Sequence, residues 1–540
     1  FSYTRQFDRR DLFKSPESLD YSTETDPKKK GSYYLVNSRS DRFDGNLTLA
    51  YNKTIDKHML NVGVGSNIMQ SETEGESFTG VGFINPDMIF IGAANAFQEN
   101  TSPQGTYDKS RLVGFFTNVN YGYGNRYFLD FSFRSDGSSK FGRNSRFAPF
   151  WSLGVAWNVH NESFWHAHEK NALKLRASVG STGTTNFSST QALTTYLYDF
   201  SREYNGNFGV SLAGYGNPDL KWQTTLAYNV GVDFTFLRGL VVFNGDFYIK
   251  NTRSLLLPVT VAPSTGFIDY VENIGKLRNT GVEARLRFNL IQDAVKDLRW
   301  NVTLSAFHNR SKITQLSNQL ETINQYANDD RANQGTVVYR QFEAGRSQTA
   351  LMVVRSGGID PATGNEIYIK RNGEMTFEYN HNDKIECGDM KPKIEGNVNT
   401  NLNWKGFNLY MLFKYQYGGK IYNATLASKV EGANPLKNAD KRVLYDRWKE
   451  PGDHAKFRRI DDRTSPYQTT RLVFDNDLFS LSSVSLSYEL PREISQKIYA
   501  DRVRLMLSTT DVFRLSTIKQ ERGTSYPFAR TFNLSLNVTF

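Results

Sequence analysis

The chain has few of the residues that form disulfides or carry catalysis. It has a single cysteine, Cys387, among 540 residues, so no intrachain disulfide can form. Long apolar runs are also missing, and the three leucines 255–257 are among the longest purely aliphatic stretches. A membrane helix needs about 20 mostly apolar residues, so a helical membrane protein is excluded. The first residues lack a charged segment followed by an apolar one, so no signal peptide is predicted.

Concentrated positive charge is lacking as well. The net charge is +10, yet the longest run of basic residues is only 28–30 (Lys-Lys-Lys). A scattered excess of this kind predicts solvated loops that face anionic lipopolysaccharide rather than a polyanion-binding surface. We therefore expect no nucleic-acid partner.

Motifs for catalysis or for cofactors are absent from the sequence. There is no G-x-S-x-G elbow, and 180–183 (Gly-Ser-Thr-Gly) is not followed by the G-K-[ST] of a phosphate loop. His166 and His168 could share one strand face, but no third metal ligand is evident, and a periplasmic turn is the simpler interpretation. Cys387 lies in a polar segment, where we expect a free thiol. We predict no catalytic residue, no cofactor and no metal.

What the chain does have is alternation. The last residues, R-T-F-N-L-S-L-N-V-T-F, are apolar at every second position, which gives a β-strand one oily face and one wet face. The apolar positions are Phe532, Leu534, Leu536, Val538 and Phe540. Similar segments recur, for example 226–236, 241–250, 282–290 and 298–306. Such strands suit the wall of a membrane β-barrel, with lipid outside and a wet lumen inside.

The predicted fold class is all-β, an antiparallel transmembrane β-barrel with about fifteen strands in this chain. No Pro/Gly/Ser linker divides residues 1–540, so we predict one continuous domain. The connections alternate between short and long, as short periplasmic turns and long extracellular loops do. The long ones, which are also the expected substrate-binding loops, are 70–110, 182–223, 251–278, 310–392 and 418–477, with a further long gap at 512–529. The short ones include 237–239, 291–297, 405–406 and 491–500.

This sorting of the connections fixes a direction for each strand. Two gaps of similar length, 137–148 and 160–171, are the weakest point of the pattern. The last strand must descend, which places Phe540 at the periplasmic rim as an assembly signal. The first strand that we count, 42–52, also descends. Because bacterial barrels have an even number of strands, an odd number is expected upstream, and Phe1 to Phe7 could be the end of one.

Residues 121–165 contain the most specific motif. A tight turn is followed by R-x-D-G-S-S-x-F, F-x-S-x-x-x-x-W and E-x-F, whose residues include Arg134, Asp136, Gly137, Ser138, Phe141 and Trp157. Further motifs are Gly216-Asn217-Pro218-Asp219-Leu220-Lys221-Trp222, Asn273-Ile274-Gly275, Arg447-Trp448 and Pro451-Gly452-Asp453. Together they resemble SusC/RagA-type TonB-dependent transporters of the Bacteroidetes outer membrane, over essentially the whole chain.

The resemblance implies a 22-stranded, plugged barrel of which residues 1–540 are the carboxy-terminal part. The plug, the TonB-box and the first strands would belong to an amino-terminal half, either proteolytically separated or outside this chain. The implied partners are that half, TonB, outer-membrane lipid and lipopolysaccharide, and a SusD-like surface lipoprotein that covers the mouth as a lid. A dimer of transporter–lid pairs is a further possibility. Counted in this way, loops 182–223 and 251–278 would touch the hinge of the lid.

The motifs also have plain structural interpretations. Gly137 would allow a positive φ where the chain leaves an ascending strand, and Pro218 with Asp219 would form a turn. Trp222 and Trp300 would belong to an aromatic girdle. Residues 360–364 (Asp-Pro-Ala-Thr-Gly) precede a segment without the clustered carboxylates that calcium requires, so we expect no metal there.

These observations favour TonB-dependent import of a large hydrophilic nutrient, an oligosaccharide or an oligopeptide, across the outer membrane. An outer-membrane adhesin or enzyme built on the same barrel is the alternative, because several loops are long. An array of soluble β-sandwiches is a third option. The sequence does not distinguish glycan from peptide.

Overall fold

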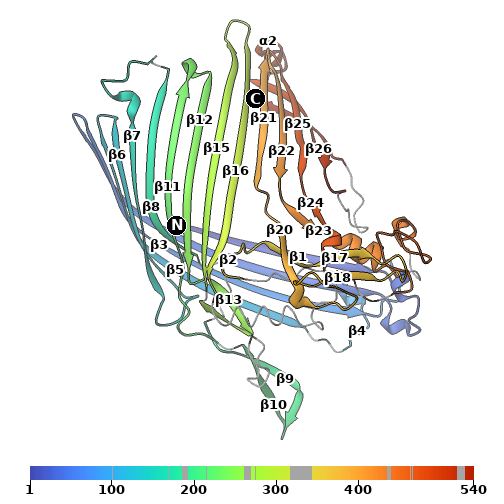
Figure 1. Ribbon diagram of the computed structural model, residues 1–540. Coiled ribbons are helices and arrows are strands. Elements are labelled where there is room, and N and C mark those ends of the chain that lie inside the picture. The colour runs from blue at the N-terminus through green and yellow to red at the C-terminus, as the bar shows by residue number, and fades with distance from the viewer. Residues whose placement is uncertain are drawn as a thin grey trace.

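Apolar residues at every second position form one large antiparallel sheet in the computed structural model of the chain (Figure 1). The structure describes all residues except 100, 102, 168–169, 185–191, 215, 261–268, 274, 317–342, 435–438, 463, 465 and 520–529. The sheet has 17 strands, one of which, β4 (Ala96–Phe97), is only two residues long. The long strands are β1 (Ser2–Lys14), β2 (Ser32–Ile55), β3 (His58–Val81), β5 (Gln104–Tyr123), β6 (Tyr127–Ser138), β7 (Phe147–Asn158), β8 (Ala172–Thr184), β11 (Gln223–Phe236), β12 (Val241–Arg253), β15 (Lys276–Asp293), β16 (Leu298–Gln315), β21 (Ile394–Trp404), β22 (Phe407–Tyr417), β25 (Leu478–Glu489), β26 (Arg502–Ser516) and β27 (Phe532–Thr539).

The long strands pair in the order in which they occur along the chain. Each long strand is hydrogen-bonded to the next, antiparallel, from β1–β2 through β8–β11 and β16–β21 to β26–β27. Among the described residues, β1 and β27 each pair on one side only, so the sheet is curved but open. An all-β antiparallel sheet of this order confirms the predicted fold class.

The connections are sorted by length between the two ends of the sheet. At one end, which we call the turn end, β21 and β22 are joined by Lys405 and Gly406 alone, with φ of 45° and 84°. Positive φ at both central residues is the hallmark of the tight turn that suits twisted hairpins. At the other end, the loop end, the connections are as long as 418–477. In Figure 1 the turn end is at the top, with the carboxy terminus, and the loop end is at the bottom.

Short strands and helices fill the loops at the loop end. The strands are β9 (Thr195–Tyr204), β10 (Asn207–Gly214), β13 (Leu256–Thr260), β14 (Asp269–Asn273), β17 (Ala350–Ile359), β18 (Glu366–Ile369), β19 (Met375–Thr376), β20 (Lys384–Asp389), β23 (Lys420–Tyr422) and β24 (Val473–Asp475). One α-helix, α2 (Arg492–Ser495), lies in the turn-end connection between β25 and β26. No helix among the described residues is both long enough and apolar enough to cross a membrane.

Several strands are longer than the alternation predicts. β2 and β3 have 24 residues each and β5 has 20, so 70–81 and 104–110, for which the sequence predicts a loop, are strand. Beyond the bilayer a strand has no need of an apolar face, which is why alternation misses this part. Charged neighbours replace it, such as Lys109 with Glu72 at 2.7 Å and Arg39 with Glu74 at 2.9 Å.

The other predicted loops lie close to where the sequence places them. The connections run over 185–222, 254–275, 316–393, 418–477 and 517–531. The sorting of connections by length fails at one place, where 139–146 at the loop end is shorter than 159–171 at the turn end. This is the place at which the sequence pattern is also weakest. The predicted strand end near Phe1 to Phe7 is the longer strand β1, in which Ser2 pairs with Asp44 halfway along β2.

The two faces of the sheet differ as predicted. On one face large apolar side chains are exposed, including Val230 at 60% and Leu534 at 72%. On the other face polar side chains pair across strands, as Arg176 does with Asp233 at 2.8 Å. A soluble sandwich would bury its apolar face against a second sheet. The exposed face suits lipid instead, and the polar face suits a wet lumen.

Buried apolar clusters lie at the loop end. One contains Tyr33, Leu35 and Phe83, a second contains Phe141, Phe150 and Trp222, and a third contains Leu351, Val353, Tyr422, Ala427, Val430, Phe457 and Leu472. The loops are therefore folded against one another rather than simply attached to strand ends.

The lipid face can be tested with two neighbouring substitutions in β11. Val230→Arg should lower the free energy of unfolding in lipid vesicles by about 2–4 kcal/mol, because it places a cation against hydrocarbon. Asn229→Arg, one residue away on the polar face, should change it little. Equal effects of the two variants in urea titrations of the vesicle-inserted full-length protein would contradict the assignment of the faces.

Candidate functional site

The family motifs come together at the loop end, although they are far apart in the sequence. Phe141, after β6, stacks on Trp222, before β11, with ring centroids 4.3 Å apart. Phe150 of β7 meets the same indole edge-on at 5.2 Å, and the Trp222 Nε1 donates to the backbone oxygen of Arg146 at 3.1 Å. Trp222 is only 6% exposed. The prediction of a girdle position for Trp222 is therefore wrong, because its ring closes a buried cluster between two loops.

Backbone contacts join the same two loops. The amide of Gly142 donates to the oxygen of Leu220 at 3.0 Å, and a side chain at Gly142 would meet the Pro218 backbone oxygen at 1.9 Å. The turn predicted at Pro218 and Asp219 is present, with the Leu220 amide bonded to the Asn217 oxygen at 3.2 Å. The glycine is thus required by a close approach of two chains.

Asn273 extends this contact to a third loop. Its side-chain oxygen accepts from the Lys221 amide at 2.8 Å, and its Nδ2 donates to the Lys221 oxygen at 2.7 Å. The same Nδ2 donates to the Ser254 oxygen at 3.1 Å. We call the contacts among 139–146, 216–222 and Asn273 the three-loop junction. The motif containing Asn273 was apparent in the sequence, but its bridging role was not.

Arg134 and Asp136 lie on the polar face of β6, next to the junction. Arg134 Nε is 2.5 Å from Asp136 Oδ1, and its Nη2 donates to Asn67 Oδ1 at 2.7 Å. Asp136 is buried. The pair links β6 to β3 across the intervening β5, so its first use is to hold the wall in place.

The structure corrects the prediction that the chain leaves its strand at Gly137 with a positive φ. Gly137 and Ser138 both remain in β6, and Gly137 has no positive φ. A Cβ at Gly137 would instead lie 2.5 Å from the ring of Phe147 on the neighbouring strand. Ser138 accepts from the Lys140 amide at 3.3 Å and so supports the turn that follows. The glycine makes room for an aromatic ring rather than for an unusual backbone angle.

Trp157 lies at the turn end, remote from the three-loop junction. Its Nε1 donates to Glu162 Oε1 at 3.0 Å, and the Tyr127 hydroxyl donates to the same oxygen at 2.6 Å. The hydrogen bonds from Tyr127 and then Trp157 lower the pKa of Glu162 below its usual range. His166 lies in the same connection, as predicted, and His168 is outside the described residues.

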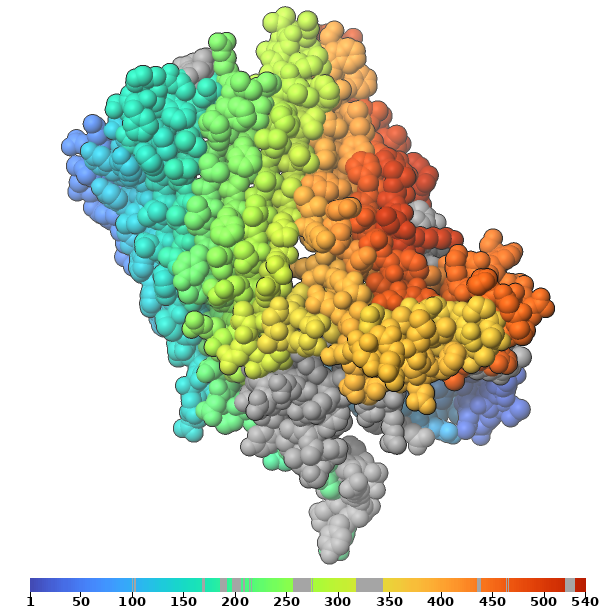
Figure 2. All heavy atoms as spheres, viewed as in Figure 1, coloured from blue at the N-terminus to red at the C-terminus, as the bar shows by residue number. Residues whose placement is uncertain are grey.

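A second group of loops forms a compact unit. We call the described parts of 347–393 and 418–477 the two-loop unit. Figure 2 shows its yellow and orange atoms as one mass across the loop end. Leu351 and Val353 of β17 pack with Val430 and Leu472 from the other loop, all buried. Each loop supplies apolar surface that it could not bury alone.

Family motifs also meet inside the two-loop unit. The Trp448 Nε1 donates to the Pro361 oxygen at 2.9 Å, and the Gly452 amide donates to that oxygen at 2.8 Å. Asp360 accepts from the Thr363 hydroxyl at 2.6 Å, and this hydrogen bond lowers the pKa of Asp360. The Asp-Pro-Ala-Thr-Gly turn is therefore a docking point for the Arg-Trp motif of the next loop.

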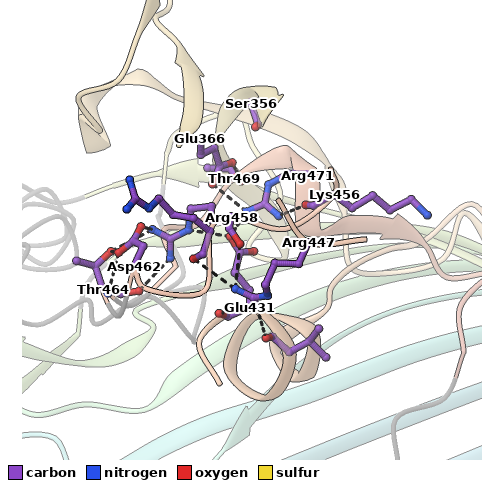
Figure 3. Close-up of polar contacts among 12 residues, drawn as sticks. Ser356, Glu366, Glu431, Arg447, Lys456, Arg458, Asp462, Thr464, Thr469 and Arg471 are labelled. Carbon is purple, nitrogen blue, oxygen red and sulfur yellow. Dashed lines mark hydrogen bonds and ion pairs between the residues drawn. The ribbon is translucent and has the colours of Figure 1, made fainter. Parts of the chain in front are cut away.

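Buried charges hold the unit together (Figure 3). Arg471 Nη2 lies 2.9 Å from Glu366 Oε2 and 2.7 Å from Glu431 Oε1. Arg458 Nε is 2.8 Å from the same Glu431 oxygen, and Thr469 donates to Glu366 at 2.6 Å. Both glutamate side chains are fully buried. Sequence reasoning missed this network, because its members are isolated charges in different loops with no local pattern.

Arg447 completes the unit without a carboxylate at hydrogen-bond distance. Its guanidinium donates to the backbone oxygens of Val443, Arg458, Val430 and Glu431 at 3.1, 2.9, 2.5 and 3.1 Å. Burial lowers the pKa of Arg447. Its role is to satisfy buried carbonyl groups from three segments of the same loop.

The one cysteine and the metal prediction can be placed in the same region. Cys387 is a free thiol, as predicted, but it lies in β20 with Sγ 3.4 Å from the Leu351 oxygen, and burial raises its pKa. Within the described part of the chain, no three His, Cys, Asp or Glu side chains are grouped as a metal site would need.

The geometry so far is that of a barrel wall with a lipid face, a polar face and folded loops at one end. The family description "TonB dependent receptor-like, beta-barrel" matches residues 1–346. The chain belongs to this family. As a TonB-dependent receptor barrel it lies in the outer membrane.

Curated relatives support the same assignment. TonB-dependent receptor P3 of Formosa agariphila is 26% identical over 536 residues, which cover 91% of this chain and 52% of the relative. TonB-dependent receptor SusC of Bacteroides thetaiotaomicron is 27% identical over 333 residues, 59% of this chain and 32% of that protein. The chain spans about half the length of the receptor P3.

Solved structures share the fold. The structure of the RagAB peptide transporter superposes with a TM-score of 0.80 at 22% identity, covering 96% of this chain and 56% of that chain. The RagAB peptide importer in its "open-open" state gives 0.81 at 21% identity, covering 100% and 58%. The resemblance to SusC and RagA predicted from the motifs is confirmed.

The three-loop junction predicts a local effect for Trp222→Ala. Removing a buried indole from an aromatic cluster should cost about 3–5 kcal/mol of local stability. Amides of 139–146 and 216–222 should exchange with deuterium faster, while strand amides remain protected. Trp404→Ala, at an exposed position of the turn end, is the matched control. Unchanged exchange in the loops would show that the cluster does not hold them.

The charge network predicts that Glu431→Gln loosens the two-loop unit. Breaking one side of a buried pair leaves uncompensated guanidinium charge and should cost about 3–5 kcal/mol. Limited proteolysis of the full-length protein should then cut within 350–390 and 440–475. Lys456→Gln, which removes an exposed pair with Asp446 at 3.0 Å, should cost about 1 kcal/mol or less. Similar cleavage rates for both variants would count against the network.

Proposed function

We propose that the chain forms the wall and loops of a TonB-dependent importer that carries a large hydrophilic nutrient, an oligosaccharide or an oligopeptide, across the outer membrane. Family membership, which matches residues 1–346, is the observation that carries this proposal. Relatives named as receptors favour transport over an adhesin or an enzyme. The polar face of the sheet offers a wet path, and the folded loops offer a selective mouth.

Residues 1–540 would be the carboxy-terminal part of the barrel. β1 and β27 each have one unpaired edge among the described residues, and unpaired backbone groups are costly in lipid. Strands from the amino-terminal half of the transporter would pair with both edges, and the same half would supply the plug on which TonB acts. Phe532, Leu534, Leu536, Val538 and Phe540 would serve as the assembly signal at the periplasmic rim.

A SusD-like lipoprotein would cover the loop end. The RagAB peptide transporter, whose name identifies its cargo as peptide, shares the fold. In this chain the three-loop junction gives loops 185–222 and 254–275 a common base, which suits the hinge of a lid. Substrate would bind between the lid and the loops, and a dimer of transporter–lid pairs would be compatible with this arrangement. Lipid and lipopolysaccharide would surround the wall.

The full-length transporter should import cargo only in cells with an active TonB complex. Native purification in mild detergent should recover the lipoprotein partner, and mass spectrometry of the complex should identify bound peptides or oligosaccharides. Uptake of the identified cargo should be lost without TonB, while its binding to purified complex should persist. Uptake that continues without TonB would contradict the proposal, and recovery of peptide or glycan decides the substrate class.

A further inference from the structure

Several arginines on the polar face of the sheet are paired with carboxylates. Arg134 meets Asp136 at 2.5 Å, and Arg176 meets Asp233 and Asp246 at 2.8 and 3.1 Å. In these contacts each guanidinium is neutralised by a carboxylate, on its own strand for Arg134 and on nearby strands for Arg176.

In the second half of the sheet, Arg287, Arg299 and Arg504 are not paired in this way. The side chains of Arg287 in β15 and of Arg299 in β16 make no ion pair or hydrogen bond within the described part of the chain. Arg504 of β26 donates from Nε and Nη2 to the Ser487 hydroxyl at 3.1 and 2.8 Å, a neutral acceptor. Their charges are uncompensated by any described carboxylate at ion-pair distance.

Strand register places these arginines on the same polar face, near the turn end. Arg299 is directly opposite Asn403, Asn403 is opposite Asn408, and Asn408 is opposite Ser487. Ser487 in turn holds Arg504. A continuous row of polar side chains therefore links β16 to β26.

Two polar cavities lie along this row and share Arg299. One, of about 400 Å³, is lined by Arg287, Asn289, Gln292 and Arg299 among others. The second, of about 800 Å³, is lined by Arg299, Asn403, Asn408, Ser487 and Arg504 among others. Both are in the size range of small-ligand sites.

The charge balance of the larger cavity is strongly positive. Its lining includes five cations, Arg299, Lys405, Arg492, Arg502 and Arg504, and two acids, Asp297 and Glu489. Glu489 is already paired with Arg502. The amides between them bond mainly to each other, with Asn408 Nδ2 2.6 Å from Asn403 Oδ1. Among the described residues, no ion pair joins Arg299 or Arg504 to either acid, although Glu489 is opposite Arg504 in the strand register.

We propose that Arg287, Arg299 and Arg504 form a carboxylate-binding wall inside the barrel, near its periplasmic end, that receives acidic cargo. A guanidinium binds a carboxylate with two parallel hydrogen bonds, and the neighbouring amides supply further donors. The carboxylates could belong to uronate sugars or to acidic residues of a peptide, which share this chemistry. The wall rests on the proposed import function and adds a preference for anionic cargo.

Binding of short probes to the full-length transporter tests the wall. The probes are hexaglutamate against hexaglutamine, and trigalacturonate against maltotriose, at low and high salt. The double variant R299Q/R504Q should bind the acidic probes about tenfold more weakly, as expected for loss of charged hydrogen bonds, and the neutral probes unchanged. Arg310→Gln, an exposed arginine at the other end of β16, is the control.

A second variant tests the proposal even where the double variant R299Q/R504Q fails to fold. Asn403→Asp places a carboxylate opposite Arg299 and leaves every arginine in place, so it should weaken binding of the acidic probes in the same direction. The two acidic probes distinguish sugar carboxylates from peptide carboxylates as the ligand.

Three results would contradict the proposal of a carboxylate-binding wall. They are equal losses for acidic and neutral probes, no change in either variant, or unchanged binding together with lower thermal stability. The last would show that the arginines hold another part of the transporter instead. Import of neutral cargo that still requires TonB would leave the proposed function intact in each case, whereas TonB-independent uptake would remove that function without changing the binding result.

Discussion

Satisfaction of backbone hydrogen bonds in lipid is the constraint on which this structure depends. A bilayer offers no water to unpaired N–H and C=O groups, so each strand must pair on both sides. Sequential antiparallel pairing from β1 to β27 meets that demand everywhere except at the two edges. The exposed apolar face, the polar lumen and the sorting of connections by length all follow. The chain crosses the membrane in one strand and must cross back in the next strand, which pairs beside the first.

The loops solve a different problem. They lie in water, where an isolated loop cannot bury enough apolar surface to stay ordered. The chain solves this by folding loops in groups. Trp222 joins two loops and Asn273 ties in a third, while Glu366, Glu431 and Arg471 fasten two others. The family motifs recur at these contacts, so their first physical role is to hold the mouth of the barrel in shape.

Much of the wall could be predicted because its pattern is local. Alternation located the strands, and loop lengths gave their direction. The pattern failed where its cause was absent: beyond the bilayer β2, β3 and β5 continue as polar strands, and alternation no longer marks them. The sequence predicts a positive φ at Gly137, whereas it is the ring of a neighbouring strand that requires a glycine there.

The sequence by itself determined the β class, the direction of the strands and the family, because these depend on a period of two residues and on contiguous motifs. Only the tertiary structure decided which distant residues meet. Trp222 is buried rather than lipid-facing, Glu431 shares a guanidinium with Glu366, and Arg299 lies across from Asn403 without a carboxylate. Such pairings depend on strand register and on loop packing, which bring together residues that no local spacing connects.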